Sequence, residues 1–499
     1  MKFRFGRLKV VLTYVGTILF VFGLVLLVPL FYSLVVSGGG QDVRRGTFAV
    51  PIFVSLILGA ACRWETQRWP GRQSVGNTEA MLICVLGWVA VSAVGALPFA
   101  LHLRISYLDA YYEAVSGFTT TGATVLTGLD AMPRSLLLWR SLTQWIGGLG
   151  ILTFFMALVF EGGFSHRLLG AESSKIEGPR IAPGVWHTLK VVWAIYVLWT
   201  VLTAVALCLC GLGVYDAVMH SLTTIAGGGF SPHDAGVAYF EQAGYAHHAL
   251  IEYVIIVGMW VSGTSFLVHY RLLKGSVKAL WDSDEMRAWW MILAVAFVLV
   301  AGSRLHALRG NGALMGETVR HSLFQVVSIG TTTGFGTRDI GSEYFTPLAR
   351  QVFLVLMLVG GCAGSTAGGL KVTRIVVLWK LMVQQVRGML KPGSEVQLLL
   401  LDRRPVSHSE VNSTAGLLFA WLFVAVIGAA VTAALSGHEA LASGSAALSA
   451  VSNVGPSYLS VQQTVHLPAT VKLVHIAAML AGRLEIIPVL IFFSGRTWR

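Results

Sequence analysis

The stretch "SGFTTTGAT" at residues 116–124 lies between two strongly apolar segments and decides how the rest of the chain is interpreted. Its three consecutive threonines and two glycines offer exposed backbone amides and carbonyls to a region otherwise suited to lipid. Hydrocarbon supplies no hydrogen bonds, so such backbone is tolerated at membrane depth only where it is buried in protein or lines water. The stretch therefore indicates a loop that enters the membrane and leaves on the same side.

Composition points to a polytopic membrane protein. The chain has 499 residues, of which 55% are hydrophobic and 12% charged, and its mean hydropathy is +0.70. No single soluble core absorbs that much apolar surface. The net charge of +12 does not indicate a nucleic-acid partner, because the basic residues are scattered over short loops without an aromatic-interleaved stripe.

The opening stretch recurs three times along the chain. The copies are "TTIAGGGFS" (223–231), "IGTTTGFGT" (329–337) and "AVSNVGPSY" (450–458). Aligning Gly122, Gly229, Gly334 and Gly455 gives spacings of 107, 105 and 121 residues. A near-constant period indicates a repeated structural unit. The sequence predicts an all-α membrane protein with four helix–re-entrant loop–helix repeats around a pseudo-four-fold pore, preceded by two extra N-terminal transmembrane helices.

Ten spanning helices are expected. The extra pair covers 10–36 and 47–62, the first helices of the repeats cover 80–101, 187–212, 286–304 and 412–435, and the second helices cover 134–160, 250–273, 346–385 and 468–494. The corresponding units are 1–78 for the extra pair, 79–185 for repeat 1, 186–285 for repeat 2, 286–408 for repeat 3 with a broken second helix, and 409–499 for repeat 4.

A short amphipathic segment precedes each loop. Segments 107–118, 214–225, 316–329 and 437–451 are too short to cross a hydrocarbon core of about 30 Å. Each opens near an acid, which suits the positive end of a helix dipole: Asp109, Asp216, Glu317 and Glu439. Ordinary solvated loop acids are the alternative. Most of the 36 lysines and arginines fall on the side of the termini, so both termini are expected in the cytoplasm and the loops on the outer side.

Four such loops satisfy their backbone if they face a common axis. Their carbonyls would then form stacked oxygen rings that replace the hydration shell of a cation. Glycine permits the required backbone angles without a Cβ, and oxygen ligands without a carboxylate ring favour a monovalent ion. Packing between helices is the alternative for any single glycine. The candidate ligands are Thr120, Thr121, Gly122, Gly227, Gly228, Gly229, Thr332, Thr333, Gly334, Asn453, Val454 and Gly455.

A second glycine-rich stretch, "VGGCAGSTAGGLK" at 359–371, interrupts the second helix of repeat 3. Each glycine costs a helix about 1 kcal/mol relative to alanine, so five glycines in ten residues break it, and the freed backbone must face a cavity. We expect this loop to cross the pore below the oxygen rings. A kinked, closely packed helix is the alternative, whereas Leu370 stands where a phosphate-binding loop needs lysine.

Arg483 is a cation within the last apolar segment. Charges inside a membrane normally face the bundle interior or a water-filled path. Glu485 is a poor partner because residues two apart lie on different faces of a helix. We expect Arg483 to project into the cavity near the glycine-rich loop and to raise the barrier for a passing cation. Snorkelling to the cytoplasmic interface is the alternative.

These motifs, together with "WRSLTQWIGGLGI" (139–151) and "GRLEI" (482–486), resemble the TrkH branch of the Trk/Ktr/HKT potassium transporter superfamily over nearly the whole chain. The resemblance implies potassium uptake in the bacterial inner membrane, K⁺ at the loop residues, and a homodimer with one pore per protomer. It also implies docking on a ring of cytosolic TrkA-type nucleotide-binding regulatory subunits. It assigns the role of intramembrane gate to Gly361, Cys362, Ala363, Gly364, Ser365, Thr366, Ala367, Gly368, Gly369 and Arg483.

Two loops depart from the family pattern. Residues 226–228 read Ala-Gly-Gly where the family usually carries hydroxyl side chains, and the fourth loop carries Asn453 and Val454. These changes predict looser selectivity than in a symmetric channel. In the superfamily a serine at the first filter glycine accompanies sodium transport, so Gly122 favours potassium.

Other functions remain as alternatives at this point. Proton- or sodium-coupled symport would need titratable groups near the outer mouth, for which His220, His233, His321 and Asp234 are candidates, although loop histidines are usually only solvated. A carrier of organic solutes predicts two inverted repeats rather than four parallel units. An enzyme would need a motif such as HExxH or GxSxG, and the sequence has neither, so no catalytic residue and no organic cofactor are expected.

Overall fold

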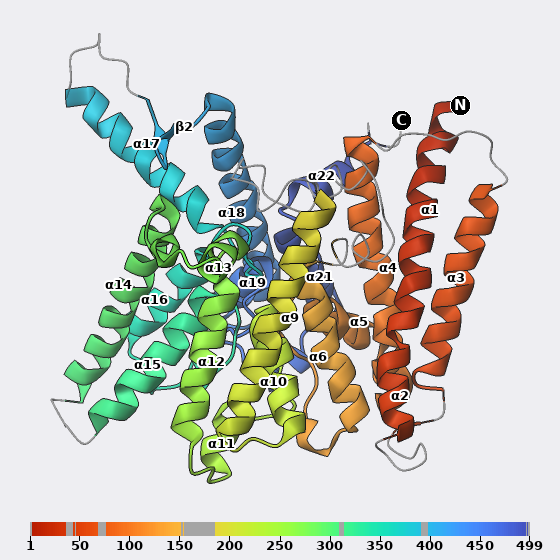
Figure 1. The fold of residues 1–499 in the computed structure, drawn as a ribbon, viewed down its shortest axis with the longest axis horizontal. Coiled ribbons are helices and arrows are strands. Elements are labelled where there is room, and N and C mark those ends of the chain that lie inside the picture. The colour runs from red at the N-terminus through yellow and green to blue at the C-terminus, as the bar shows by residue number, and fades with distance from the viewer. Residues whose placement is uncertain are drawn as a thin grey trace.

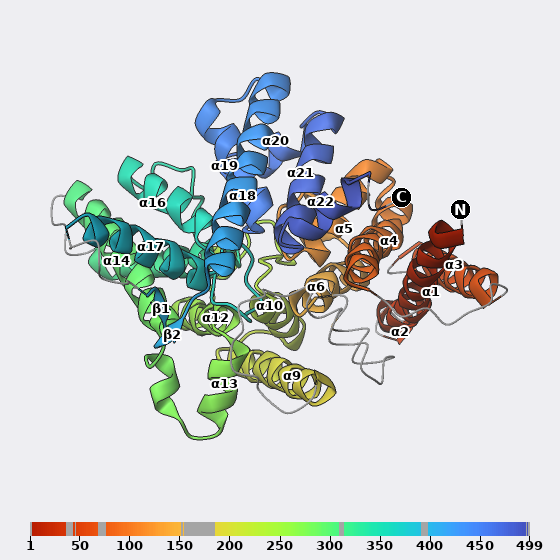
Figure 2. The same cartoon turned by 90° about the horizontal axis from the view of Figure 1, so that it is seen from above.

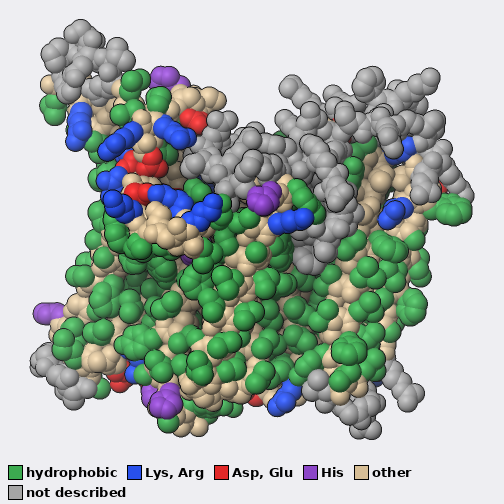
Figure 3. All heavy atoms as spheres, viewed as in Figure 1, with side chains coloured by type: hydrophobic (Ala, Val, Ile, Leu, Met, Phe, Trp, Pro, Cys, Tyr) green, Lys and Arg blue, Asp and Glu red, His purple; other side chains and the backbone are tan. Residues whose placement is uncertain are grey.

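The computed structural model of the chain describes residues 2–35, 43–44, 46–67, 76–150, 153, 185–308, 314–390, 398–495 and 497. Almost all regular structure in these ranges is helical, which confirms the all-α class. Six described helices are long and apolar enough to cross a membrane, or up to seven if α12 (His248–Gly263) and α13 (Phe266–Leu273) count as one span. A broad hydrophobic surface covers the middle of the face drawn in Figure 3, as a membrane requires.

The N-terminal helices form a separate pair at one edge of the molecule (Figures 1 and 2). α1 (Lys2–Val25) and α2 (Leu27–Val35) make one interrupted span, and α3 (Ala49–Gln67) returns beside α1. The two helices approach closely because Gly59 has no Cβ, which would lie 2.7 Å from the backbone nitrogen of Phe20. The pair is attached to the rest of the molecule by packing of α1 on α4 (Asn77–Leu103).

Each repeat contains a long helix, a half-length helix and a second helix that is interrupted. The long helices are α4, α9 (Val185–Leu209), α14 (Asp284–Ala307) and α18 (His408–Ser436). The half-length helices are α5 (Tyr107–Phe118), α10 (Val214–Ala226), α15 (Met315–Gly330) and α19 (Ala440–Ser452). The second helices are α6 (Arg134–Gly148), α12 with α13, α16 (Pro347–Leu358) with α17 (Val372–Leu390), and α21 (Ala469–Arg483) with α22 (Ile487–Phe493).

Short elements connect these helices. They are η1 (Leu129–Ala131), α11 (Ala238–Gln242), η2 (Val277–Leu280), α20 (Val461–Val465) and a hairpin of β1 (Leu400–Leu401) and β2 (Arg404–Pro405) in which Leu400 lies opposite Pro405. The expected starts of the repeats at residues 79, 186, 286 and 409 fall within two residues of the starts of α4, α9, α14 and α18.

The repeats close into a ring. Within each repeat the half-length helix packs on both the long helix and the second helix. Between repeats, the second helix packs on the half-length helix of the next repeat: α6 on α10, α12 on α15, α16 on α19, and α21 back on α5. This closed order is that of a pseudo-four-fold assembly, and Figure 2 shows the α1–α3 pair outside it.

The half-length helices lie where the sequence predicts them, with ends displaced by at most three residues. Asp109, Asp216 and Glu317 occupy first turns, and Glu439 is the N-cap of α19. Carboxylates at these places stabilise the positive end of the helix dipole. In α5 the hydroxyl of Ser106 also accepts a hydrogen bond of 3.1 Å from the backbone N–H of Asp109.

The second helices differ from the prediction, which placed a break in repeat 3 alone. α6 ends at Gly148, α13 turns by 108° from α12, and α21 stops at Arg483 before α22 begins at Ile487. Residues 151, 152 and 154–160 of the expected span 134–160 lie outside the described residues. The expectation of unbroken helices at 250–273 and 468–494 is wrong. After α12 the carbonyls of Ser262 and Gly263 bind residues of the 359–371 stretch, and after α21 the chain turns with Glu485 and Ile486 at positive φ.

An aromatic cluster joins the N-terminal pair to repeat 1. Phe22 of α1 contacts Phe118 at the end of α5 and Trp139 of α6, with ring centroids 5.8 Å apart in both pairs. All three rings are fully buried, and the indole of Trp139 donates a 3.0 Å hydrogen bond to the carbonyl of Gly95. Buried aromatic pairs of this kind add about 0.5–1.5 kcal/mol beyond their area. The cluster fixes the end of α5, from which the first loop departs.

The two chain ends lie on the same face of the molecule (Figure 1). Basic side chains gather on this face, above the hydrophobic surface and near α13 and α17 (Figure 3). They include the exposed Lys274, Lys278 and Arg287. An excess of lysine and arginine on one side of a membrane protein is typical of the cytoplasmic side.

Candidate functional site

The four half-length helices end in one shared backbone arrangement. We name the segments that follow them loops 1 to 4: residues 119–122, 226–229, 331–334 and 452–455. In each loop one N–H donates to the carbonyl five residues earlier at 2.9–3.0 Å: Thr121 to Ser116, Gly228 to Thr223, Thr333 to Ser328 and Val454 to Ser449. This bond is typical of helix C-termini that end in a left-handed residue.

The residues on either side of that donor have positive φ in all four loops. The first has φ between 54° and 68° and the second between 71° and 99°: Thr120 and Gly122, Gly227 and Gly229, Thr332 and Gly334, Asn453 and Gly455. A left-handed residue with a Cβ costs about 1–2 kcal/mol, so the strain at Thr120, Thr332 and Asn453 is held by the surrounding structure. The same backbone angles occur in three different loop sequences, since loops 1 and 3 both read Thr-Thr-Thr-Gly, which indicates one required backbone shape.

In each loop the second residue with positive φ is a glycine, and this glycine faces a carbonyl oxygen of the next loop. A Cβ on Gly122 would overlap the oxygen of Gly228, and the same holds for Gly229 with Thr333, Gly334 with Val454, and Gly455 with Thr121. The four oxygens belong to equivalent residues, and the order of contacts returns to loop 1. The structure therefore gathers the predicted ligand residues of all four repeats around one axis.

A cavity of about 540 Å³ opens onto this ring and is lined by Gly122, Gly229, Gly334 and Gly455. These glycines are half-buried, whereas the residues that precede them in their loops are buried. The ring of glycines is thus the level at which the cavity meets the oxygen-lined path.

Side chains hold loops 1, 3 and 4 from within the ring. The hydroxyls of Thr119 and Thr121 lie 2.7 Å apart in loop 1, and those of Thr331 and Thr333 lie 2.8 Å apart in loop 3. In loop 4 the amide of Asn453 donates to the hydroxyl of Thr121 at 3.0 Å, so loop 4 is tied directly to loop 1.

Loop 2 has no such side chains, and a residue of α6 holds it instead. The amide nitrogen of Gln144 donates to the carbonyl of Gly228, and its oxygen accepts from the N–H of Phe230 at 3.0 Å. Gln144 is fully buried. The sequence prediction missed this residue, although it lies in the quoted "WRSLTQWIGGLGI" segment, because its partners are more than 80 residues away in the chain.

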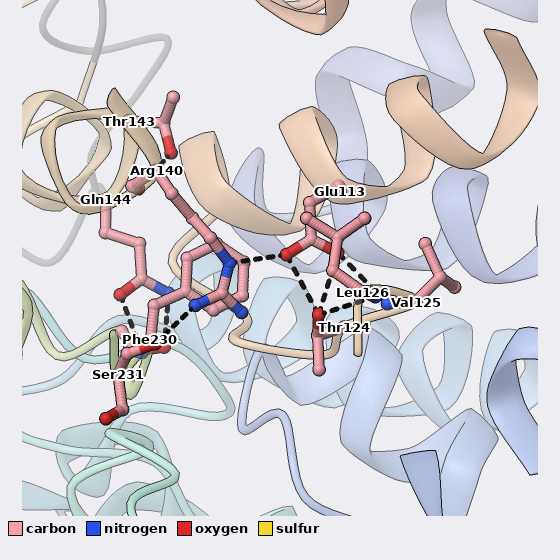
Figure 4. Close-up of polar contacts among 10 residues, drawn as sticks. Glu113, Thr124, Val125, Leu126, Arg140, Thr143, Gln144, Phe230 and Ser231 are labelled. Carbon is pink, nitrogen blue, oxygen red and sulfur yellow. Dashed lines mark hydrogen bonds and ion pairs between the residues drawn. The ribbon is translucent and has the colours of Figure 1, made fainter. Parts of the chain in front are cut away.

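A buried ion pair lies behind loops 1 and 2 (Figure 4). The Nε of Arg140 lies 2.7 Å from a carboxylate oxygen of Glu113, and the two side chains are only 3% and 0% exposed. Glu113 also accepts the N–H of Val125 at 3.0 Å, just beyond loop 1. Arg140 donates to the carbonyl of Ser231 at 2.8 Å and stacks on the ring of Phe230 at 3.5 Å, just beyond loop 2. The pair therefore clamps two loops together.

Charged pairs also join other neighbouring repeats. Glu252 of α12 binds Arg320 of α15 at 2.9 Å, and Lys472 of α21 binds Asp109 of α5 at 2.5 Å. Asp109 is therefore both a helix-dipole partner and a contact between repeats 4 and 1. The alternative of a solvated loop acid is wrong for this residue.

The glycine loop (residues 359–371) passes directly under loops 2, 3 and 4. Its base is closed by the N–H of Gly360, which donates to the carbonyl of Leu370 at 2.8 Å. At its tip the N–H of Gly368 donates to the hydroxyl of Thr332 at 2.7 Å, and the hydroxyl of Thr366 donates to the carbonyl of Ile225 at 3.1 Å. A Cβ on Gly368 would overlap a carbonyl of loop 4, that of Ser452.

The break between α12 and α13 is the docking site of this glycine loop. In a continuous helix the N–H of Phe266 would donate to the carbonyl of Ser262, but here it donates to Gly364 at 2.9 Å. The carbonyl of Ser262 instead accepts from Thr366, and that of Gly263 accepts from Cys362 at 2.9 Å. The break thus exchanges helical hydrogen bonds for bonds to the loop, which the local sequence does not reveal.

Arg483 lies between the glycine loop and loop 1. Its guanidinium donates to the hydroxyl of Thr120 at 3.0 Å and to the carbonyl of Thr366 at 2.9 Å. It also donates to the carbonyls of Gly147 and Gly148 at 2.6 Å, at the end of α6. Arg483 therefore faces the interior as expected, and snorkelling to the interface is wrong.

A second cavity, of about 820 Å³, lies on the other side of the glycine loop. It is lined by Ala363, Gly364, Gly368, Gly369 and Arg483, together with other described residues, but by no member of the glycine ring. The glycine loop and Arg483 thus separate this cavity from the path through loops 1 to 4.

Of the titratable candidates, His233 and Asp234 lie in the wall of the 540 Å³ cavity. His233 contacts Asp130 at 2.6 Å and Asp216 at 3.4 Å. Burial opposes the charged imidazole, but hydrogen bonds and attraction from these two carboxylates outweigh it and raise the pKa of His233. His220 and His321 are fully buried within α10 and α15, so the interpretation of these histidines as solvated loop residues is wrong.

Comparison with known proteins agrees with this architecture. The model of the TrkH family, described as cation transport protein, matches residues 45–499. The Trk system potassium uptake protein TrkH of Escherichia coli strain K12 is 34% identical over 497 residues, covering 97% of this chain and 98% of its own length. The TrkH of Halomonas elongata is 30% identical over 504 residues, covering 99% of each chain.

A solved structure extends the agreement to the fold. The crystal structure of the potassium transporter TrkH from Vibrio parahaemolyticus matches with a TM-score of 0.85 at 30% identity and covers 100% of both chains. Sequence and structure thus agree along the whole length and confirm the resemblance drawn from the motifs. The chain belongs to the TrkH family of cation transport proteins.

Proposed function

We propose that this chain carries K⁺ into the cell through the ring of loops 1 to 4. The observation that carries the proposal is the cyclic packing of Gly122, Gly229, Gly334 and Gly455 on the carbonyls of successive loops. Backbone carbonyls converging on one axis can replace the hydration shell of a dehydrated monovalent cation. The choice of K⁺ is supported by the relatives, which are named potassium uptake proteins.

In this proposal the ligands are main-chain oxygens of residues 120–122, 227–229, 332–334 and 453–455. Hydrogen bonds to the helix ends and the side-chain contacts described above hold these segments in place. The half-length helices add the negative ends of their dipoles at the same place, which favours a cation. The absence of a carboxylate among these residues favours a monovalent ion over Ca²⁺ or Mg²⁺.

We propose that residues 361–369 of the glycine loop and Arg483 form the gate. The support is their position, since the loop binds Ile225 and Thr332 above it and Arg483 bridges Thr120 and Thr366. A cation that leaves the ring must pass both the loop and a positive charge. Opening would move the loop away from its contacts and leave a path into the 820 Å³ cavity.

Uptake of this kind needs no coupled ion. The membrane potential supplies about 2.3 kcal/mol per charge per 100 mV, so about 150 mV supplies about 3.5 kcal/mol, or about a 300-fold gradient. Proton- or sodium-coupled symport is the second candidate, because the titratable His233 lines the outer cavity. Accumulation of K⁺ that follows an imposed pH or Na⁺ gradient at clamped voltage would favour the second candidate.

We also propose the bacterial inner membrane as the location, with both termini in the cytoplasm. The clustering of basic side chains on the face that carries the chain ends supports this orientation. The relatives are named as components of a Trk system, which supports a cytosolic TrkA-type nucleotide-binding partner. A homodimer with one pore per protomer completes the proposal.

The test is cation flux into liposomes that contain the purified protein, with K⁺, Rb⁺, Na⁺ and choline compared. K⁺ and Rb⁺ are expected to enter fastest, and choline is expected to be excluded. Gly334→Ala places a Cβ against the carbonyl of Val454 and should change the K⁺/Na⁺ ratio, whereas Gly302→Ala on α14 meets nothing within 4 Å and should not. Equal effects of the two variants, or entry of choline, would contradict the proposal.

A further inference from the structure

Loop 2 is chemically the weakest member of the ring. Its three consecutive glycines, 227–229, have more backbone freedom than any other residues would, and each costs about 0.5–1 kcal/mol more to order than alanine. Ala226 and Gly228 stand where loops 1 and 3 carry the hydroxyl pairs Thr119–Thr121 and Thr331–Thr333. A ring that distinguishes ions by the positions and field strength of its oxygens needs this loop to be held from outside.

Gln144 occupies the space and makes the contacts that loop 2 lacks. A Cβ on Gly228 would overlap the carboxamide of Gln144, so this side chain fills the volume in which a threonine would otherwise lie. Its amide binds both sides of Gly229, through the carbonyl of Gly228 and the N–H of Phe230. The orientation of the amide is fixed by these partners, because the flipped amide would set oxygen against oxygen and N–H against N–H.

Repeats 2 and 4 carry methionine at the position of Gln144. Gly148, at the end of α6, packs on Ala226, the residue before the first positive-φ residue of loop 2. Gly263, at the end of α12, packs on Thr331, which has the same position in loop 3. Counting back four residues from Gly263 gives Met259, the counterpart of Gln144 in α12. Gly482 of α21 packs under the end of α19, as Gly147 of α6 packs under the end of α5. Gln144 lies three residues before Gly147, and the residue three before Gly482 is Met479. The amide thus occurs where it serves the loop that has no hydroxyl side chain.

We infer that Gln144 is a specificity-determining positioning residue, which fixes the Gly228 carbonyl in the oxygen ring and takes one of its lone pairs. The carbonyl of Gly228 is equivalent to those of Thr121, Thr333 and Val454, but it shares its charge with an N–H donor. Loop 2 is therefore rigid but contributes a weaker oxygen than the other three. The inference rests on the proposed function, since it concerns the selectivity of the same ring.

Gln144→Met tests the amide directly. Methionine is the counterpart residue in α12 and α21, has nearly the same length and cannot make either hydrogen bond. The K⁺/Na⁺ permeability ratio in liposomes should fall about tenfold, while K⁺ flux stays within about threefold of wild type. Gln351→Met, on the exposed face of α16, is the matched control and should leave both quantities unchanged. An unchanged ratio in Gln144→Met, or equal losses of K⁺ and Na⁺ flux, would overturn the inference.

A rescue experiment separates positioning from general damage. Gln144→Ala empties the space beside Gly228, whose φ lies outside the left-handed region, so the backbone there accepts a threonine. Adding Ala226→Thr and Gly228→Thr to Gln144→Ala recreates the hydroxyl pair of loops 1 and 3 and should restore the ratio. Gly228→Thr with Gln144 present should instead collide and lower it. Failure of the threonine pair to restore selectivity would overturn the equivalence, whereas wild-type protein without selective K⁺ flux would overturn the proposed function itself.

Discussion

Replacing Gly122 by serine perturbs the ring at one defined oxygen. Gly122 has a φ of 82°, and a Cβ at this position would overlap the carbonyl of Gly228 in the next loop. Neither the charge nor the helices change. The substitution must therefore move loop 1, loop 2 or both away from the axis, because the backbone atoms on either side cannot give way as a flexible side chain does.

The structure gives the size of the effect. A left-handed residue with a Cβ costs about 1–2 kcal/mol, and the collision adds to this unless the loops shift. If that free energy is lost from the preference of the ring for K⁺ over Na⁺, the permeability ratio falls about 5- to 30-fold, at about 1.4 kcal/mol per tenfold. The direction agrees with the expectation, drawn from the family resemblance, that serine at this glycine relaxes discrimination against sodium.

The assay is the K⁺/Na⁺ permeability ratio of purified protein in liposomes, measured from the reversal potential. Gly244→Ser is the matched control, because Gly244 has a φ of 76° and nothing within 4 Å of the added Cβ. It carries the same backbone strain away from the ring. A ratio that is unchanged in Gly122→Ser, or that falls equally in Gly244→Ser, would refute the reasoning.

Three further outcomes are expected. Arg483→Ala should raise basal K⁺ flux by up to about 100-fold, because a cation about 6 Å from a guanidinium is repelled by about 3 kcal/mol at an effective dielectric constant of about 20. Arg483→Lys keeps the positive charge and should not raise the flux. Glu113→Ala should destabilise the protein by about 3–5 kcal/mol in thermal unfolding, because it leaves Arg140 buried without its carboxylate; an unchanged melting temperature would contradict this. The pKa of His233 is raised, so its pairing with Asp130 stabilises the fold fully below about pH 6.5, and this stabilisation is lost as the pH rises through the raised pKa. In thermal unfolding, wild type should therefore lose more stability than His233→Gln between about pH 6 and about pH 9.

Much of the fold and the composition of the ring could be predicted from local sequence. The half-length helices are short amphipathic segments that start at acids, so hydrophobic periodicity and N-terminal signals define them. The glycines at 122, 229, 334 and 455 have φ between 71° and 99°, which favours glycine, and their regular spacing identifies the repeat. The glycine loop at 359–371 is recognisable because so many glycines cannot remain helical.

The rest depends on contacts between distant segments. α12 and α21 look like continuous apolar helices. The break after α12 is favoured because the glycine loop binds its freed carbonyls, and α21 ends at Arg483, which binds carbonyls at the end of α6. Arg140 and Gln144 lie on a helix whose pattern reveals amphipathicity but not partners, and both bind residues 84 or more positions away. Local rules describe where the backbone turns. They do not describe which neighbour will hold it.

Anomalous diffraction from crystals grown in Rb⁺ would show whether a cation binds between the four loops, since Rb⁺ replaces K⁺ and is located independently of the protein. Anomalous peaks are expected on the axis among the carbonyls of Thr121, Gly228, Thr333 and Val454, above the glycine loop. Ordered ions only at carboxylates of the outer cavity, with the space between the four loops empty of Rb⁺, would contradict this expectation.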